Sequence, residues 1–405
     1  MTDKAVKQYL QHYAEPEVRC LQHWPQHDQP AYRHVLVIPA YQESSDFLHR
    51  ALQSAWFNRD ILLILVINQP NTQTDISPQQ QLFQYARSAG ELIRQQQNLT
   101  LISTNTETAQ NSGDILLVDR YTLSIPAKQG VGLARKIGAD LALMLIDKGM
   151  ISSDWICSTD ADAILPDDYF SVLNTTDPDW IAACYAFEHV GGEPAVRQAT
   201  LIYQQAMHYY VKGLQQAGSP YAHFTIGSTL AFKAAAYAQV RGFPKRAAGE
   251  DFYLLNKLIK TGIVGRIEQT VIKLQARLSD RVPFGTGMST AKIIKLTEQG
   301  LPFCYYHPQS FIALQQVLQQ FGSLWDARND LAAWLEQLPE YSAELLLKAG
   351  LARFVETQRR QSVSKQQFDS QLVNWFDGLK TLQFIHGLRD RVYPDVPLEF
   401  DPPAE

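Results

Sequence analysis

The sequence lacks the features that mark several common classes of protein. It has four cysteines in 405 residues: Cys20, Cys157, Cys184 and Cys304. No two of them form a CxxC pair, which excludes a zinc ribbon and a disulfide framework. Free cysteines fit a reducing compartment, so we expect a cytoplasmic protein. The longest apolar runs, 61–67 and 141–146, fall far short of the roughly 20 residues that span a bilayer.

The sequence also lacks a strong excess of either positive or negative charge. Lysine and arginine total 36 against 41 acidic residues, which gives a net charge of -5, and the basic residues are spread along the chain. A nucleic-acid partner requires a basic face, and a membrane surface requires a polybasic cluster. The polar segment 1–17 has no apolar signal-peptide run. We therefore expect a soluble protein with no transmembrane segment and no nucleic-acid partner.

Apolar strands alternate with amphipathic helices through the first part of the chain. Buried strands are predicted at 34–39, 61–67, 99–103, 115–118 and 155–159. Helices are predicted at 43–59 and 128–148, with apolar residues at helical spacing, and a polar, glutamine-rich helix is predicted at 78–96. This alternation predicts a doubly wound α/β sheet.

Length and pattern predict more than one structural part. A chain of 405 residues exceeds the roughly 250–300 at which a single core stops growing. Long helical stretches dominate after about residue 291, at 311–321, 324–336, 342–359 and 365–379. We therefore predict an N-terminal helix and connector at 1–30, an α/β domain at 31–290 and a helical region at 291–405.

The first candidate site follows the strand at 155–159. Ligands bind α/β sheets at the carboxyl ends of the strands, and there the chain has Asp160 and Asp162. Two crowded carboxylates favour a neutralising cation, and Mg²⁺ or Mn²⁺ suits such a pair together with substrate phosphates. The short pattern alone fits equally well a turn cap beside a solvated acid.

The second candidate is the pair Glu250 and Asp251, placed before a predicted helix at 252–259. An acceptor hydroxyl is a poor nucleophile until a base removes its proton, and an acid at a helix start can be that base. The alternative is a simple complement to the helix dipole.

Two cationic segments complete the candidates. Lys128 and Arg135 flank a Gly-x-Gly at the start of a helix, an arrangement that suits a diphosphate. Arg277 and Arg281 lie beside a glycine-rich loop and would close over phosphates. Surface lysines and arginines on a helix or turn are the alternative in both cases.

Taken in order, five segments resemble the family 2 glycosyltransferases of the GT-A fold. They are VIPAYQE at 37–43, GLARKIGAD at 132–140, STDAD at 158–162, FTIGSTLAFK at 224–233 and GFPKRAAGEDFYL at 242–254. The resemblance covers about residues 33–290 and depends on order and spacing. It implies a mixed sheet flanked by helices, and a metal-dependent, inverting transfer of sugar from a nucleotide-diphosphate sugar to an acceptor hydroxyl.

The resemblance also implies roles for single residues. On the nucleotide-sugar side, contacts are implied for Pro39, Tyr41, Glu43, Arg135, Asp160 and Gly227, with Ser228 beside the last. Asp162, with Asp160, would hold Mn²⁺ or Mg²⁺. Asp251 resembles the catalytic base, and Glu250 stands beside it.

The sequence departs from the family in three places. Asn68 stands where the family usually has an aspartate that reads the nucleobase, and an amide changes that preference. No QxxRW-like segment of processive synthases is present, which favours single additions. A third protein ligand for the metal is not assigned, although His223 and His307 are candidates.

Rival functions are weighed on the same residues. A phosphatase using an aspartyl nucleophile would need threonine or valine at Ile164 and a site after the first strand. A nucleotidyltransferase carries a glycine-rich loop where this chain has PAYQE. A non-catalytic module that binds nucleotide-sugars remains the third alternative. The donor, the acceptor and the oligomeric state are not identified by the sequence.

Overall fold

The computed structural model describes residues 2–24, 29–104, 112–279 and 285–397, and the chain forms two compact units. The α/β unit comprises Met1–Gly192 and Thr225–Phe284. The helical unit comprises Glu193–Phe224 and Gly285–Glu405. The sequence placed boundaries at residues 30 and 290 instead. The structure groups the N-terminal segment with the sheet, and the segment 193–224 with the C-terminal helices.

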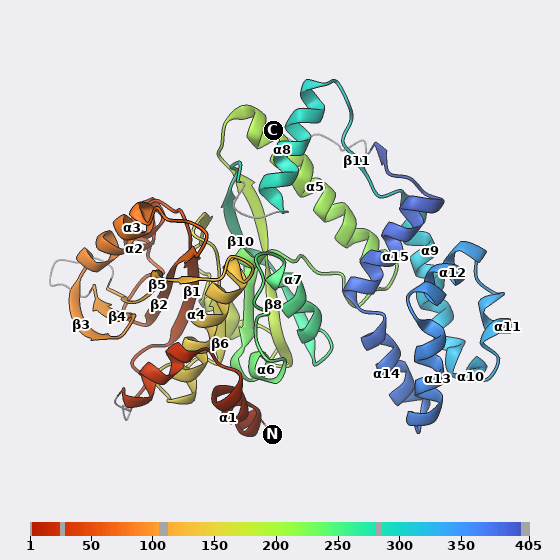
Figure 1. Ribbon diagram of the computed structural model, residues 1–405, viewed down its shortest axis with the longest axis horizontal. Coiled ribbons are helices and arrows are strands. Elements are labelled where there is room, and N and C mark those ends of the chain that lie inside the picture. The colour runs from red at the N-terminus through yellow and green to blue at the C-terminus, as the bar shows by residue number, and fades with distance from the viewer. Residues whose placement is uncertain (1, 25–28, 105–111, 280–284, 398–405) are drawn as a thin grey trace. The chain divides into compact units, whose positions relative to one another are not determined.

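A large mixed sheet forms the centre of the α/β unit (Figure 1). Over the described residues it has the order β3-β4-β5-β2-β1-β6-β9-β8-β10-β7. The first five strands in the chain are β1 (His34–Ala40), β2 (Ile61–Pro70), β3 (Glu91–Gln96), β4 (Leu99–Ser103) and β5 (Asp114–Ile125). The others are β6 (Trp155–Ser158), β7 (Ala163–Ile164), β8 (Trp180–Val190), β9 (Leu230–Lys233) and β10 (Ile263–Gln275). The predicted fold class, a mixed α/β sheet flanked by helices, is confirmed.

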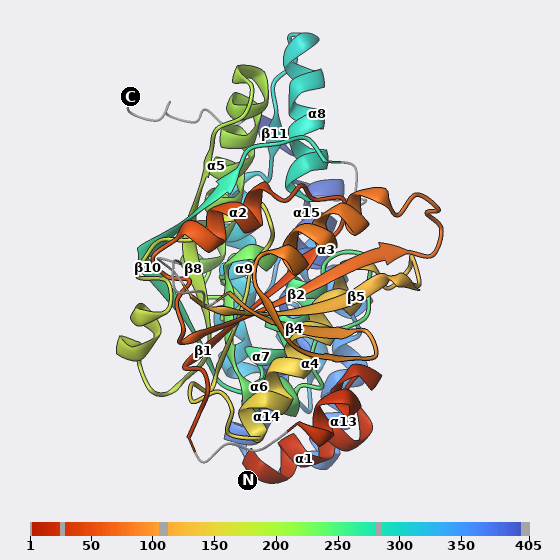
Figure 2. The same ribbon diagram turned by 90° about the vertical axis from the view of Figure 1, so that its left-hand side faces the viewer.

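Both faces of the central strands are covered by helices. Figure 2 shows α2 (Asp46–Gln53) and α3 (Ser77–Ser88) on one side of the sheet and α4 (Gly130–Asp147) on the other. Strand β1 is buried along its whole length, as its continuous apolar run predicts. The helices α1 (Thr2–His12), α6 (Ala234–Gln239) and α7 (Glu250–Leu258) extend the layer that contains α4.

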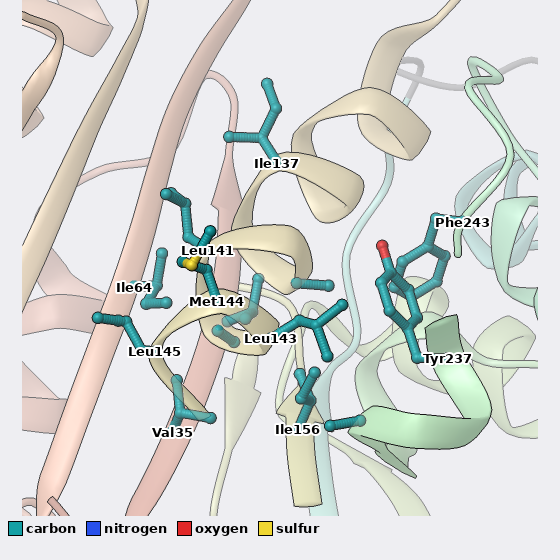
Figure 3. Close-up of a cluster of buried hydrophobic side chains, with 14 of the residues drawn as sticks. Val35, Ile64, Ile137, Leu141, Leu143, Met144, Leu145, Ile156, Tyr237 and Phe243 are labelled. Atoms are coloured by element: carbon teal, nitrogen blue, oxygen red, sulfur yellow. The ribbon is translucent and has the colours of Figure 1, made fainter. Parts of the chain in front are cut away.

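Helix α4 is the main contact between that layer and the sheet. In Figure 3 its apolar side chains lie between Val35 and Ile64 of the strands and the ring pair Tyr237–Phe243. A Cβ at Gly138 would stand 2.3 Å from a methyl group of Val37, so glycine permits this close approach. The helix that carries Arg135 is therefore held rigidly against the strands.

Several predicted elements in the α/β unit have other bounds in the structure. The helix predicted at 43–59 spans only Asp46–Gln53, and the strand predicted at 115–118 spans Asp114–Ile125. Strand β2 continues to Pro70, beyond the predicted end at residue 67, because its neighbour β5 continues beside it to Ile125. The predicted helix at 78–96 is wrong in its second half. It ends at Ser88, and 91–96 instead forms β3, which pairs with β4 through a turn in which Gln97 has a φ of 52°. Hydrogen bonding to a neighbouring strand outweighs local helix preference there.

The helical unit has its own hydrophobic core. Its helices are α5 (Pro194–Gln216), α8 (Thr286–Glu298), α9 (Pro308–Gln320), α10 (Leu324–Ala327), α11 (Leu331–Leu335), α12 (Glu340–Lys348), α13 (Leu351–Gln361), α14 (Lys365–Trp375) and α15 (Gly378–Arg391). A short antiparallel pair, β11 (Cys304–Tyr305) and β12 (Val396–Pro397), accompanies them. Trp334 is fully buried in this core, and its indole N–H donates to the hydroxyl of Ser323 at 3.1 Å.

Three of the four helical stretches predicted in the C-terminal region are divided or shorter in the structure, whereas the first, predicted at 311–321, spans Pro308–Gln320. The stretch 324–336 divides into α10 and α11. The stretch 342–359 divides into two helices at Gly350, whose φ of 94° favours glycine. The stretch 365–379 ends at Trp375, and Asp377 then caps the next helix by accepting from the N–H of Lys380. Within the described part of the chain, no helix is both long enough and apolar enough to cross a membrane.

Candidate active site

Three connections leave the sheet at one edge. Strand β6 is parallel to β1, with Ser158 opposite Val37, and the N–H of Thr159 donates to the carbonyl of Val37 at 3.1 Å. Strand β9 is antiparallel to β6 with Leu230 opposite Ser158, so the short 3₁₀ turn Gly227–Thr229 arrives at the same edge. The topology therefore brings the segments after β1 and β6 beside the segment before β9.

Arg135 of α4 is buried at this edge and joins two acidic residues. Its Nε donates to Oε1 of Glu250 at 2.8 Å, and its Nη2 donates to Oδ1 of Asp160 at 2.5 Å. Its Nη1 donates to the hydroxyl of Ser158 at 2.9 Å. Burial opposes the charge of this arginine, but the carboxylates of Asp160 and Glu250 raise its pKa above the usual value. One guanidinium thus links the strand-end acid to the Glu-Asp step.

Gly227 is required by this arrangement. A Cβ at that position would stand 2.2 Å from Nη2 of Arg135. The next residue, Ser228, donates its hydroxyl to Oδ2 of Asp160 at 2.6 Å, and its carbonyl accepts from the hydroxyl of Thr159 at 2.8 Å. Both carboxylate oxygens of Asp160 are therefore oriented by hydrogen bonds.

Glu250 and Asp251 occupy the first turn of α7. The helix follows Gly249, whose φ of 72° is left-handed and favours glycine. Glu250 is buried, and its carboxylate is paired with Arg135. Asp251 accepts from the N–H of Phe252 at 2.7 Å. Burial, and next the charge of Glu250, raise the pKa of Asp251 from 3.8 to about 7, although Arg135 acts in the opposite direction. A carboxyl group with such a pKa is suited to accept a proton near neutral pH.

The two glycines at the start of α4, Gly130 and Gly132, allow the loop at 244–247 to pack closely against the helix. The N–H of Gly132 donates to the carbonyl of Arg246 at 2.9 Å, and a Cβ at Gly132 would stand 2.5 Å from the carbonyl oxygen of Pro244. A Cβ at Gly130, whose φ is 37°, would stand 2.7 Å from Cα of Ala247. These glycines position the loop that leads into the Glu-Asp step, and one amide of the first turn is used for this contact.

A second arginine joins two other predicted site residues. Nη1 of Arg277 donates to Oε2 of Glu43 at 2.9 Å, and Nη2 donates to Oε1 of the same carboxylate at 2.7 Å. Nη2 also lies 2.9 Å from Oδ2 of Asp162. Arg277 follows the end of β10, which pairs with the short strand β7 directly after Asp162. Burial opposes the charge of Arg277, but the hydrogen bonds to Glu43 and the charges of Asp162 and Glu43 raise its pKa above the usual value.

The remaining predicted residues lie around these two networks or outside the description. Pro39 is buried in β1 opposite Val66, and Tyr41 follows the strand with its side chain half-buried. Asn68 lies inside β2, and is buried, instead of following the strand as predicted. Lys128 is exposed in the turn before α4. Arg281 lies outside the described residues.

The two histidines considered as further metal ligands lie in the helical unit. Nδ1 of His307 accepts from the N–H of Gln309 at 3.1 Å and so caps α9. The backbone N–H of His223 donates to the carbonyl of Tyr221. Within the ranges that the structure describes, no group of three or more histidine, cysteine, aspartate or glutamate side chains is placed to hold a metal ion.

The charges of the site test whether a divalent ion fits. In the described part of the site, five acids, namely Glu43, Asp160, Asp162, Glu250 and Asp251, face two arginines. Asp160 and Asp162 are partly exposed carboxylates, the hard oxygen donors that Mg²⁺ and Mn²⁺ prefer. Such ions need only one or two protein carboxylates when water and phosphate supply the other ligands. The donor set fits the metal, but arginine already neutralises each of the two predicted ligands.

A small pocket adjoins the site on the α2 side of the sheet. Its walls come from α2, from Ile38 of β1 and from the segment 159–165, which includes Asp160. The lining is mostly apolar, with Arg50 and Ser54 as the polar side chains contributed by α2 and its end. The segment that carries the two acids therefore has the Arg135 network on one side and an apolar hollow on the other.

Sequence reasoning selected most of these residues but missed their partners. Ser158 was not singled out, although it stands two residues before Asp160 at a predicted strand end. Arg277 was expected to face phosphates, and the structure places it on Glu43 and Asp162. Local spacing gives no signal for the pairing of Ser158 with Arg135 or for that of Arg277 with Glu43, because the partners lie 23 and 234 residues apart in the chain.

The comparisons with known proteins give a likeness of structure only. No protein-family model matches the sequence, and no curated protein matches it. The structure is similar to TarS 1–349 of S. aureus in complex with UDP-GlcNAc, at 9% identity and a TM-score of 0.38, over 85% of this chain and 91% of that one. It is similar to the same fragment in complex with UDP, at 10% identity and a TM-score of 0.37, over 82% and 93%. A mycobacterial protein is similar at 11% identity and a TM-score of 0.36, over 68% and 78%.

Proposed function

We propose that the protein is a glycosyltransferase that moves a sugar from a nucleotide-diphosphate sugar to an acceptor hydroxyl. The observation that carries the proposal is the double contact of Arg135 with Asp160 and Glu250. Through this contact Asp160, at the end of β6, and Glu250, of the Glu-Asp step, are bound to the same guanidinium group. Donor binding at a strand end and proton removal at a helix start then take place in one site.

Asp251 is the proposed base. Its raised pKa of about 7 means that the carboxylate and the acid are both populated near neutral pH. Glu250 is held by Arg135 and acts on Asp251 through its charge. In the proposed reaction Asp251 accepts the proton of the acceptor hydroxyl, whose oxygen attacks the sugar from the face opposite the leaving diphosphate. The transfer is therefore proposed to invert the anomeric centre.

A divalent ion, Mn²⁺ or Mg²⁺, is proposed to be held by Asp162 with Asp160. When bound, it would supply positive charge to the leaving diphosphate. The excess of acids over arginines supports this part of the proposal, because a diphosphate needs additional positive charge to enter such a site. Arg135 keeps Asp160 oriented through one oxygen, and Ser228 does so through the other.

The test is a panel of UDP-, GDP- and dTDP-sugars, each measured with and without Mn²⁺. A ligand that binds only the folded protein raises its unfolding temperature, so the panel identifies the donor nucleotide and its dependence on metal. Release of free nucleoside diphosphate from the donor that binds then measures turnover, with the sugar passing to water or to an added acceptor hydroxyl. Binding without any release of diphosphate would indicate a binding module and contradict the proposal.

Asp251→Asn separates binding from chemistry. The variant should bind the donor as the wild type does and lose turnover by roughly a hundredfold or more, the usual scale of base catalysis. Asp154→Asn is the matched control, because Asp154 is an exposed acid immediately before β6 and thus at the opposite end of that strand from Asp160. Full turnover in Asp251→Asn would remove this residue from the mechanism.

A further inference from the structure

Arg277 occupies the position at which positive charge is needed between Glu43 and Asp162. Both of its terminal nitrogens bond the carboxylate of Glu43, and Nη2 is shared with Oδ2 of Asp162. The side chain of Glu43 is nearly buried, whereas those of Asp162 and Arg277 keep 24% and 33% of their surface exposed. Water and solutes can therefore reach the arginine–Asp162 contact from outside.

The backbone is fixed up to the residue before Arg277. The N–H of Gln275 donates to the carbonyl of Asp162 at 3.2 Å, and the N–H of Ala276 donates to the carbonyl of Val190 at 2.9 Å. Arg277 is the first residue beyond these bonds, and the next residue, Leu278, is exposed. The long side chain of Arg277 can leave the carboxylates by rotation about its own bonds, with no change in the sheet.

A guanidinium and a divalent ion cannot both use the same face of Asp162. Each neutralises the carboxylate, and the two positive charges repel one another at this distance. A diphosphate reverses the situation, because its oxygens match the fork of an arginine and also bind the metal.

We propose that Arg277 and the divalent ion exchange places on Asp162. Without donor, Arg277 holds Glu43 and Asp162. When the donor arrives, Arg277 moves to the diphosphate and the ion takes Asp162. Metal and nucleoside diphosphate then bind cooperatively, and neither binds well alone. This inference deepens the proposed function and rests on it for the identity of the donor.

The first experiment uses Mn²⁺ alone, with free Mn²⁺ measured by electron paramagnetic resonance. Arg277→Gln should bind Mn²⁺ at least about tenfold more tightly than the wild type, since the charge-assisted contact between Nη2 and Asp162 no longer competes with the ion. Arg277→Lys should be intermediate, because lysine keeps the charge and loses the fork. Equal or weaker binding by Arg277→Gln would overturn the proposal.

Two controls keep the result specific. Arg266→Gln removes a similarly exposed arginine of β10 that pairs with Glu268, and it should bind Mn²⁺ as the wild type does. The double variant Arg277→Gln with Asp162→Asn should lose the gain, because the gain depends on Asp162. A gain that survives in the double variant, or that also occurs in Arg266→Gln, would refute the exchange. Thermal unfolding of Arg277→Lys and Arg277→Gln is measured alongside, to check that both variants are folded.

The second experiment measures how far a saturating concentration of the nucleoside diphosphate that binds, whether UDP, GDP or dTDP, tightens Mn²⁺ binding. The wild type should show a large factor, and Arg277→Gln should show a factor smaller by about the same tenfold, because coupling between two ligands is reciprocal. An unchanged factor would contradict the role of Arg277 in the coupling. Failure of UDP, GDP and dTDP to bind at all would remove the proposed function, whereas the experiment with Mn²⁺ alone still decides the exchange on Asp162.

Discussion

Replacing Asp251 by asparagine should make the protein more stable at neutral and alkaline pH while it removes the proposed base. The folded structure raises the pKa of this carboxyl group from 3.8 to about 7, through burial first and the charge of Glu250 second. Below pH 4 the group is protonated in both the folded and the unfolded chain, so it costs nothing. Between pH 4 and 7 the unfolded chain releases the proton and the folded chain keeps it, so the cost to folding grows with pH.

The size of the effect follows from the same shift. One pKa unit corresponds to about 1.36 kcal/mol, and a shift of about three units therefore gives a cost of about 4 kcal/mol above pH 7. Asparagine carries no charge and avoids this cost, while its side-chain oxygen can still accept from the N–H of Phe252. The free energy of unfolding of Asp251→Asn minus that of the wild type should therefore be smallest at about pH 4, rise with pH, and reach a plateau above about pH 7.

Urea unfolding at several pH values between 4.5 and 8.5, followed by tryptophan fluorescence, measures this difference. Asp75→Asn is the control of opposite sign. Asp75 is exposed, and hydrogen bonds from the side chain and backbone of Ser77 lower its pKa, so its replacement should not stabilise the protein at high pH. A stability difference for Asp251→Asn that is independent of pH, or that falls as pH rises, would refute the assignment of a buried, strained charge to Asp251.

Three further predictions test the surroundings of the site. Gly227→Ala should lower the free energy of unfolding by about 3 kcal/mol, because the added Cβ displaces the buried guanidinium of Arg135 from its carboxylates. Gly322→Ala is the control, since its Cβ meets no atom within 4 Å, and it should change the free energy of unfolding by less than about 0.5 kcal/mol. Asp140→Ala should cost about 3 to 5 kcal/mol in urea unfolding, because the buried Lys136 loses the carboxylate at 2.9 Å and keeps only that of Glu15 at 3.9 Å. Tyr237→Phe should cost only about 1 kcal/mol, for its hydrogen bond to Asp140 and a longer one from Tyr9. In the enzyme assay kcat/KM should increase with pH and level off above about pH 7, where Asp251 is ionised. A flat profile from pH 5 to 8 would contradict the role of Asp251 as the base.

The α/β core was predictable because its signal is local. Continuous apolar runs at β1 and β2 are buried on both faces, and the apolar residues at helical spacing in 130–147 lie in α4, which is buried all round from Gly132 to Leu145. Errors occurred where a neighbouring strand decides the structure. The polar residues of β3 form a strand only because β4 lies beside them, and no pattern within 91–96 requires this.

The candidate site was predictable in its members and not in its connections. Strand ends and a helix start pointed to Glu43, Asp160, Asp162 and Asp251, and the structure places them at one end of the central strands or in contact with groups there, while their roles stay predictions. The short spacing between Asp160 and Asp162 suggested that the two share one cation. The structure gives each its own arginine, because the chain between them turns and one faces α4 while the other faces the end of β10.

By itself the sequence determined which segments are apolar enough to be buried and which acids follow a strand. Apolar runs and the residues that end a strand are features of neighbours within a few residues. Tertiary structure alone decided how these charges are neutralised. Arg135 reaches Glu250 across 115 residues and Arg277 reaches Glu43 across 234, and an ion pair depends on the distance between atoms, which spacing along the chain does not set at such separations.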